Sequence, residues 1–271
     1  MPELPEVETT KNGISKPLLG KSISEVCIYQ PKLRWPVPEN ITNDLKNKTL
    51  KQIKRRGKYI LLTFENGTLL IHLGMSGRLC ITQKSHAPKK HDHVDFYFED
   101  GKCLRYTDPR RFGSILWTAE HPSKHKLLMH LGPEPLTCDF NGEHLFHLSR
   151  KRSVTIKQFI MDSKTVVGVG NIYASEALFL SGISPTRAAG KISRKRFDTL
   201  AKEIKAVLEK AIEAGGTTLK DFLSASGKPG YFIQKLHVYG REDEPCSKCK
   251  KPIKKITIGQ RSSYYCSSCQ T

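Results

Sequence analysis

Two C-x-x-C pairs close to the C-terminus constrain the fold of this chain more strongly than any other feature of its sequence. Sixteen residues separate the pairs, and the four cysteines are Cys246, Cys249, Cys266 and Cys269. Four thiolates at this spacing predict a closed tetrahedral zinc site of the structural kind. Residues 254–258 and 263–265 should form a hairpin turning at residues 259–261, which the metal would stabilise because so small a ribbon is unstable alone. Four free thiols or two disulfides are the alternative reading of this spacing.

The net charge indicates what kind of partner the chain binds. Its 271 residues include 45 Lys and Arg against 26 Asp and Glu, which gives a net charge of +19. Such an excess favours a polyanion such as nucleic acid, because each cation near a phosphate releases a condensed counterion. A basic protein with no nucleic-acid role is the alternative. An anionic membrane surface is less favoured, because no strongly amphipathic basic helix stands out.

The cellular setting expected from the sequence is the cytosol. The N-terminus, MPELPEVETT, is acidic and has no apolar core, so it is not a secretion signal. The longest apolar stretches, at residues 59–64 and 68–73, are too short to cross a bilayer. A reducing setting favours metal over disulfides at the cysteine pairs. Four other cysteines are expected to be buried free thiols: Cys27, Cys80, Cys103 and Cys138.

The first half of the chain has the pattern of a helix followed by many short strands. Residues 4–19 predict a helix, with Pro2 suited to a first-turn position. Residues 93–98 alternate apolar and polar side chains, which predicts a half-buried strand. The other expected strands are residues 22–30, 57–64, 67–73, 77–82, 102–107 and 112–117. Strands at this spacing predict a sandwich or a barrel.

From about residue 150 the pattern becomes helical. Its clearest helix spans residues 194–213, carries one apolar stripe and ends at Gly215-Gly216. The fold class is therefore α+β, with a β-rich domain first, a helical domain second and a zinc-ribbon hairpin at the C-terminus. The expected boundaries are 1–134 for the first domain, 135–150 for a linker, 151–235 for the helical domain and 236–271 for the zinc module.

The first residues carry groups suited to covalent chemistry. Removal of Met1 would leave Pro2 with a free secondary amine, which can attack an aldehydic sugar carbon and form an iminium. A neighbouring helix N-terminus would disfavour protonation of that amine. Glu3 and Glu6 supply carboxyl groups one turn apart, able to donate or accept protons there. Ordinary helix capping is the alternative interpretation of proline with acidic neighbours.

Three segments together resemble the bacterial formamidopyrimidine-DNA glycosylases. They are MPELPEVET at the start, VVGVGNIY at residues 166–173, and the four-cysteine ribbon with Gln260-Arg261, in the expected order along the whole chain. The resemblance implies a bifunctional glycosylase and abasic-site lyase acting on 8-oxoguanine and ring-opened purines in double-stranded DNA. It also implies an antiparallel β-sandwich domain with an N-terminal helix, a helix–two-turn–helix domain with DNA running in the cleft between them, and one structural zinc ion.

The resemblance assigns catalytic roles residue by residue. Pro2 would attack the sugar C1′ and form a Schiff base, while Glu3 acts as general acid with Glu6 in support. Lys58 would contact phosphate and donate a proton in β-elimination. Arg261 would contact phosphate and act in δ-elimination, which leaves a one-nucleotide gap. If Met1 were retained, Pro2 would be a tertiary amide and the lyase chemistry would be lost.

The resemblance also implies contacts with DNA. The target base must leave the stack, and Met75, Arg111 and Phe112 match the three side chains that fill the resulting gap. A core methionine, a core phenylalanine and a solvated arginine are the alternative interpretations. Further contacts are implied for Asn171, as a phosphate seat or an N-cap, and for His93 and Arg152, with Lys157 and Tyr239 as additional candidates. Residues 217–231 match the loop that covers the flipped base.

Two other functions compete with this interpretation. One is the endonuclease VIII branch of the same superfamily, which prefers oxidised pyrimidines; the PELP start and Arg111-Phe112 favour the purine branch. The other is a DNA-binding protein without catalysis, which leaves Pro2, Glu3 and Lys58 unexplained. A monomer is expected, because repair of one flipped base requires no dyad symmetry.

Overall fold

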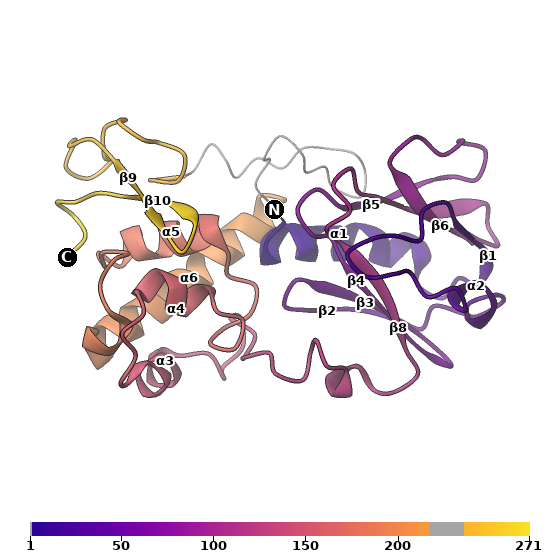
Figure 1. Ribbon diagram of the computed structural model, residues 1–271, viewed down its shortest axis with the longest axis horizontal. Coiled ribbons are helices and arrows are strands. Elements are labelled where there is room, and N and C mark those ends of the chain that lie inside the picture. Colours follow the sequence, from indigo (N-terminus) through magenta and orange to yellow (C-terminus); the bar gives the residue numbers. More distant parts are fainter. Residues whose placement is uncertain (1, 217–235) are drawn as a thin grey trace. The chain divides into compact units, whose positions relative to one another are not determined.

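The computed structural model describes residues 2–216 and 236–271, which fold as two compact units (Figure 1). Among these residues, unit 1 contains 2–129 and 214–216, and unit 2 contains 130–213 and 236–271. In this part of the chain, every helix is too short or too polar to span a bilayer.

Unit 1 is an antiparallel β-sandwich with a helix at its N-terminus, as the sequence predicts. One sheet has the order β1-β6-β7-β5, in the ranges Ile23–Ile28, Asp92–Phe98, Lys102–Thr107 and Arg78–Gln83. The other has the order β2-β3-β4-β8, in the ranges Gln52–Arg56, Tyr59–Phe64, Gly67–His72 and Ser114–Thr118. Short helices α2 and η1 occupy Ile41–Asp44 and Pro122–Lys124.

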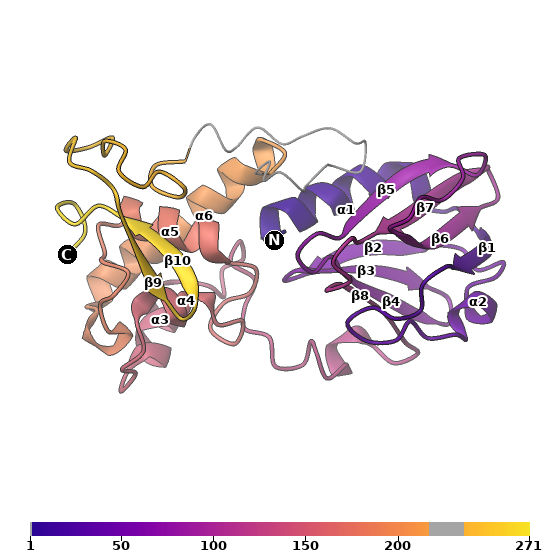
Figure 2. The ribbon, with the colours of Figure 1, turned by 45° about the horizontal axis from the view of Figure 1, so that its top comes forward.

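Helix α1, Leu4–Leu18, joins the two sheets at the edge of a common core (Figure 2). It packs against β2 and β3 of one sheet and β5 of the other. Its buried face and the inner faces of both sheets form one apolar cluster, which includes Ile14, Leu18, Phe96, Leu104, Ile60 and Ile71. Burial of this face from both sides holds the start of α1 in a fixed place on the sandwich.

Two details of unit 1 differ from the sequence prediction. Pro2 does not lie in the first turn of α1; the helix begins at Leu4, and Pro5 occupies the first turn. Strand β6 is buried at all seven residues rather than on one face. Its polar face is covered because Arg105 of β7 donates two hydrogen bonds to Asp95, at 2.8 and 2.7 Å, and so neutralises that carboxylate.

The prediction of buried free thiols is wrong in part. Cys103 is buried, but Cys27 and Cys80 are only half-buried and Cys138 is exposed. All four are free. Cys138 lies in the irregular segment before α3, where its side chain is exposed.

Unit 2 consists of helices and a two-stranded ribbon. The helices are α3 (Gly142–Ser149), α4 (Ile156–Met161), α5 (Asn171–Leu180), η2 (Ala189–Lys191) and α6 (Arg194–Glu213). Strands β9 (Lys254–Ile258) and β10 (Arg261–Tyr265) form the predicted hairpin, and β10 packs on α5. The stretch 135–150, expected to be a linker, contains α3, which packs on α6. The domain boundaries drawn from the sequence stay a prediction.

Candidate active site and nucleic-acid interface

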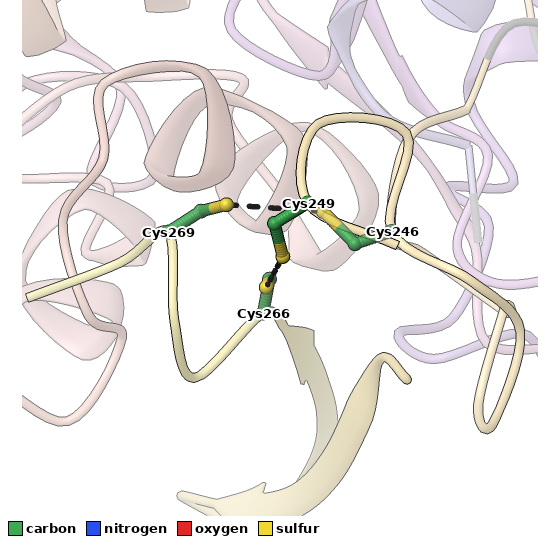
Figure 3. Close-up of side chains that lie close together, drawn as sticks. All are labelled: Cys246, Cys249, Cys266 and Cys269. Carbon is green, nitrogen blue, oxygen red and sulfur yellow. Dashed lines mark hydrogen bonds between the residues drawn. The ribbon is translucent and has the colours of Figure 1, made fainter. Parts of the chain in front are cut away.

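The four C-terminal cysteines form a metal site. Their Sγ atoms all lie within 4.8 Å of one another (Figure 3). The Sγ atoms of Cys249 and Cys266 are 3.4 Å apart, far longer than the roughly 2.05 Å of a disulfide, and all four thiols are free. Tetrahedral Zn–S bonds of about 2.3 Å place sulfurs about 3.8 Å apart, so the cluster fits zinc. The prediction of one structural zinc ion is confirmed, and all four ligand positions come from protein.

The start of α1 buries the acidic residues that the sequence singles out. Glu3 and Glu6 are 2% and 3% exposed, and Pro2 beside them is buried. The Glu6 carboxylate accepts a hydrogen bond from the Glu3 backbone N–H at 2.8 Å. Gly216 packs closely on the other side, since a Cβ there would lie 3.3 Å from the Glu6 carboxylate. Glu6 is therefore held by the fold and itself fixes the backbone of Glu3.

Lys58 lies in the tight turn between β2 and β3, next to a histidine that the sequence analysis overlooked. Tyr59 pairs with His72 across β3 and β4, and their rings lie 4.8 Å apart. Burial, with the positive charges of Lys58 and Arg34, lowers the pKa of His72 from 6.5 to about 4. Its Nδ1 accepts the Gly74 N–H at 3.0 Å, so the neutral ring carries its proton on Nε2.

The three residues expected to fill the gap lie on two neighbouring loops of unit 1. Met75 is 37% exposed and Phe112 is 48% exposed, so neither is a core residue. Arg111 is exposed too. The guanidinium group of its neighbour Arg110 lies 4.8 Å from the centre of the Phe112 ring. Exposed apolar side chains beside arginines suit insertion between bases.

His93 is held in place by the backbone. It is 4% exposed, and its Nε2 donates a hydrogen bond to the Asp108 carbonyl at 2.7 Å. Its ring lines a shallow pocket together with Tyr29, Lys89 and Lys90. The basic rim of this pocket suits a phosphate contact beside a histidine of fixed orientation.

In unit 2, two polar side chains hold the hairpin that carries Arg261. The Lys157 Nζ donates to the Ser262 carbonyl at 3.2 Å and to the Ser263 Oγ at 2.7 Å, and the Asn171 amide donates to the same carbonyl at 2.9 Å. Lys157 is only 1% exposed, and its amine holds the ribbon; its expected contact with DNA stays a prediction. Arg261 itself is exposed at the start of β10.

Asn171 does not cap α5, because the N-cap residue is Gly170. Its Oδ1 is buried and has no hydrogen-bond partner among the described residues, although its amide is used. The side chain therefore holds the hairpin rather than the first turn of its own helix.

The remaining expected contacts differ in how firmly the fold holds them. Arg152 is exposed after α3. Tyr239 lies 5.1 Å from the Tyr264 ring, and its backbone is held by Glu176, a buried residue that the sequence analysis overlooked. The Glu176 carboxylate accepts the N–H groups of residues 237–239 at 2.7, 2.9 and 2.9 Å. Residues 217–231, expected to cover the flipped base, lie outside the described residues.

Three family models match the chain in succession. They are the formamidopyrimidine-DNA glycosylase N-terminal domain at residues 1–115, the H2TH domain of the same glycosylases at 131–223, and a zinc finger found in FPG and IleRS at 243–271. The fold and these matches define a DNA glycosylase built from a β-sandwich, a helix–two-turn–helix module and a zinc finger. The chain belongs to the formamidopyrimidine-DNA glycosylase family.

Known relatives agree along the full length. A formamidopyrimidine-DNA glycosylase of Saccharophagus degradans is 57% identical over 270 residues, which cover all of both chains. Two solved structures of the Lactococcus lactis Fpg protein are similar. One, bound to DNA containing N7-benzyl-Fapy-dG, has 32% identity and a TM-score of 0.92 and covers 100% of both chains. The other, bound to abasic-site DNA, has 31% identity and a TM-score of 0.91 and covers 99% of both.

Proposed function

We propose that this chain is a base-excision-repair glycosylase and abasic-site lyase that removes 8-oxoguanine and formamidopyrimidines from duplex DNA. The observation that carries the proposal is the start of α1, where Pro2 precedes a first turn whose Glu3 and Glu6 carboxyl groups are both buried. The two carboxyl groups do form a reciprocal capping box, which is the ordinary role of such residues, but they are buried rather than exposed. They lie beside the Pro2 nitrogen, which is an amide nitrogen in the full chain and becomes a secondary amine once Met1 is removed.

The chemistry begins at the Pro2 nitrogen. It attacks the sugar C1′, and the glycosidic bond breaks. The base leaves with that electron pair and takes up a proton, and the Pro2 nitrogen loses the proton that it carried as an amine. The ring then opens as the C1′–O4′ bond breaks, the nitrogen lone pair forms the iminium, and O4′ takes a proton from the Glu3 carboxyl group. The positive end of α1 disfavours protonation of the amine beforehand. Glu6 is a positioning residue, because its carboxylate holds the Glu3 N–H.

Two eliminations complete the strand cut. Loss of a C2′ proton from the iminium expels the 3′ phosphate, and loss of the C4′ proton expels the 5′ phosphate. Lys58 contacts phosphate and donates a proton in the first elimination, and Arg261 contacts phosphate and acts in the second. Water then hydrolyses the iminium, frees Pro2 and leaves a one-nucleotide gap with phosphates at both ends. The zinc ion, held by its four cysteines, supplies structure and takes no part in these steps.

The DNA contacts divide between the two units. Met75, Arg111 and Phe112 fill the space left by the flipped nucleotide, and Arg111 faces the cytosine left unpaired. His93, Arg152 and Asn171 contact phosphates. The protein acts as a monomer in the bacterial cytosol, where its DNA lies. An endonuclease VIII type of activity is not favoured, because the full-length relatives are formamidopyrimidine-DNA glycosylases.

Borohydride trapping tests the proposal. Protein whose N-terminus has been checked by mass spectrometry is incubated with an 8-oxoguanine:C duplex and sodium borohydride, which reduces the iminium to a stable amine. We expect a covalent adduct that maps to Pro2, and its loss in Pro2→Gly and in protein that retains Met1. Pro5→Ala, a change of the next proline in the same helix start, should still trap.

Protein that binds the duplex but neither traps nor nicks it would establish the non-catalytic alternative. Faster excision of thymine glycol than of 8-oxoguanine would establish the pyrimidine-directed alternative.

A further inference from the structure

One buried carboxylate of unit 1 has no part in the chemistry above. Asp108 directly follows β7 and is 0% exposed. Its Oδ1 accepts the Ser76 hydroxyl at 2.6 Å, and its Oδ2 accepts the Gly113 N–H at 2.8 Å and the Tyr106 hydroxyl at 3.3 Å. Ser76 lies on the loop that carries Met75, while Gly113 ends the turn that carries Arg111 and Phe112. A single side chain therefore bonds to both loops.

The backbone of Asp108 is used in the same way. Its carbonyl accepts the Arg111 N–H at 3.1 Å and the His93 Nε2–H at 2.7 Å. The Ser76 hydroxyl, in turn, accepts the Arg110 N–H at 3.1 Å. Through these hydrogen bonds, Asp108 joins the Met75 loop to the turn that contains Arg111, and Ser76 contacts the same turn directly.

The two loops also touch backbone to backbone. Gly74 has φ +62°, and a Cβ there would lie 2.4 Å from the Gly113 nitrogen and the Phe112 carbonyl carbon. Only glycine allows this approach, so the two loops lie in direct backbone contact at this point. Arg111 has φ +57°, a left-handed conformation that is rare for a residue with a side chain. Such strain persists where the surrounding structure imposes it, and the Arg111 N–H bond to Asp108 is one of the contacts that impose it.

A carboxylate is a costly group for packing alone. Burying one without a paired cation is unfavourable unless hydrogen bonds replace the lost water, which an apolar residue would not require. The donors to Asp108 are two hydroxyls and one backbone N–H, and the hydroxyl of Ser76 and the N–H of Gly113 belong to the two loops. The buried Asp108 carboxylate therefore lies where its hydrogen bonds connect the Met75 loop to the Arg111–Phe112 turn.

We infer that Asp108 is a positioning residue that makes the Met75 loop and the Arg111–Phe112 turn one rigid unit, so that the three gap-filling side chains enter the duplex together. The inference rests on the proposed function and extends it to a residue that never touches DNA. Asp108 should matter when a base must be extruded and its space filled. It should matter little when the chemistry acts on an abasic site in single-stranded DNA, where no space is left to fill.

The test compares two substrates for the same variants. Asp108→Asn keeps the shape but removes the charge and one acceptor, and Ser76→Ala removes the two hydrogen bonds of the Ser76 hydroxyl, to Asp108 and from the Arg110 N–H. Single-turnover excision of 8-oxoguanine from duplex is measured beside strand cleavage at an abasic site in single-stranded DNA. Asp95→Asn is the matched control: Asp95 is also 0% exposed in the same sandwich, but it bonds Arg105, Tyr97 and Tyr29.

We expect Asp108→Asn to slow duplex excision about tenfold to a hundredfold and single-strand cleavage less than about threefold, since hydrogen bonds to a charged group are lost. Ser76→Ala should show the same selectivity with a smaller loss, and it carries the test if Asp108→Asn does not fold. Asp95→Asn should lower thermal stability and change the two rates alike. Equal losses on both substrates for the Asp108 and Ser76 variants, or no loss on either, would overturn the inference. Failure of the wild-type protein to excise or trap would instead overturn the proposed function.

Discussion

The two candidate groups at the ends of the proposed reaction, Pro2 and Arg261, are supported in opposite ways. Pro2 and Glu3 stand at the start of α1, whose apolar face packs into the core shared by two sheets. Arg261 stands at the start of β10 in a ribbon with a small core, which contains two of the zinc-binding cysteines, Cys246 and Cys266. The nucleophile thus depends on apolar burial, and the arginine depends on a metal and polar anchors. Removing the metal or the polar contacts should therefore disturb Arg261 and leave Pro2 in place.

The largest effect should follow loss of the metal. A structural zinc ion contributes about 10–16 kcal/mol to its module at neutral pH, so Cys249→Ser or chelation should unfold the ribbon. Unit 1 should stay folded, because its core contains none of the four ligands. We expect zinc content to fall to zero, duplex binding to weaken more than about a hundredfold, and calorimetry to retain the transition of unit 1.

Cys138→Ser is the control for that experiment. Its thiol is free, exposed and distant in sequence from the four ligands, so zinc content and duplex binding should not change. If chelation abolished the calorimetric transition of unit 1 as well, folding of unit 1 would depend on the zinc-bound ribbon.

Which elements could be predicted from the sequence depends on whether their signals are local. The C-x-x-C pairs, the helix 194–213 and the hairpin turn are local signals, and each was predicted close to its observed bounds. Strand β2 was missed because its five residues, QIKRR, are mostly polar and form an edge of the sheet. Helix α5 was hard to delimit because it is buried nearly all round and so shows no amphipathic stripe.

The candidate site follows the same rule. Pro2, Glu3, Lys58 and Arg261 could be assigned because short motifs carry them. His72, Asp108 and Glu176 could not, because their partners come from strand register or from residues far along the chain. One signal was present for His72: the Glu65-Asn66-Gly67 turn sets the β3–β4 register and so places it opposite Tyr59, beside Lys58. The role of Lys157 in holding the ribbon could not be predicted, because its sequence neighbours do not reveal that its amine bonds to Ser262 and Ser263.

A smaller effect should follow removal of the polar anchor of the ribbon. Lys157→Met keeps the length of the side chain but leaves the Ser262 carbonyl and the Ser263 hydroxyl without the lysine's hydrogen bonds, a cost of about 2–3 kcal/mol. Because Arg261 precedes these residues, the second elimination should suffer more than the first. Gel analysis of abasic duplex should show more ends with an unsaturated sugar and fewer with a 3′ phosphate, while trapping at Pro2 persists.

The matched control is Lys164→Met, an exposed lysine of the same unit, which should leave the ratio of the two products unchanged. If Lys157→Met lowered trapping and both eliminations in proportion, the lysine would support the whole protein rather than the arginine alone.

The smallest effect should appear in the pH dependence of unit 1, where His72 is partly buried beside positive charges. Burial, with Lys58 and Arg34, lowers the pKa of His72 from 6.5 to about 4. The unfolded chain binds this proton near pH 6.5 and the folded chain only near pH 4. Stability is therefore fully present above pH 6.5 and is lost as the pH falls toward 4, by about 1–3 kcal/mol. Urea unfolding of the wild type at several pH values should show this loss.

His72→Gln removes the titrating group and keeps an oxygen that can accept the Gly74 N–H, so its stability should vary less between pH 6.5 and 4 than that of the wild type. His91→Gln, a change of an exposed histidine in the same unit, should reproduce the wild-type curve. Identical slopes for wild type and His72→Gln would mean that water and protons reach this histidine in the folded protein. The surroundings of Lys58 would then depend on polar contacts, as the ribbon does. Support by apolar burial would then distinguish unit 1 from unit 2 only at Pro2 and the core beneath it.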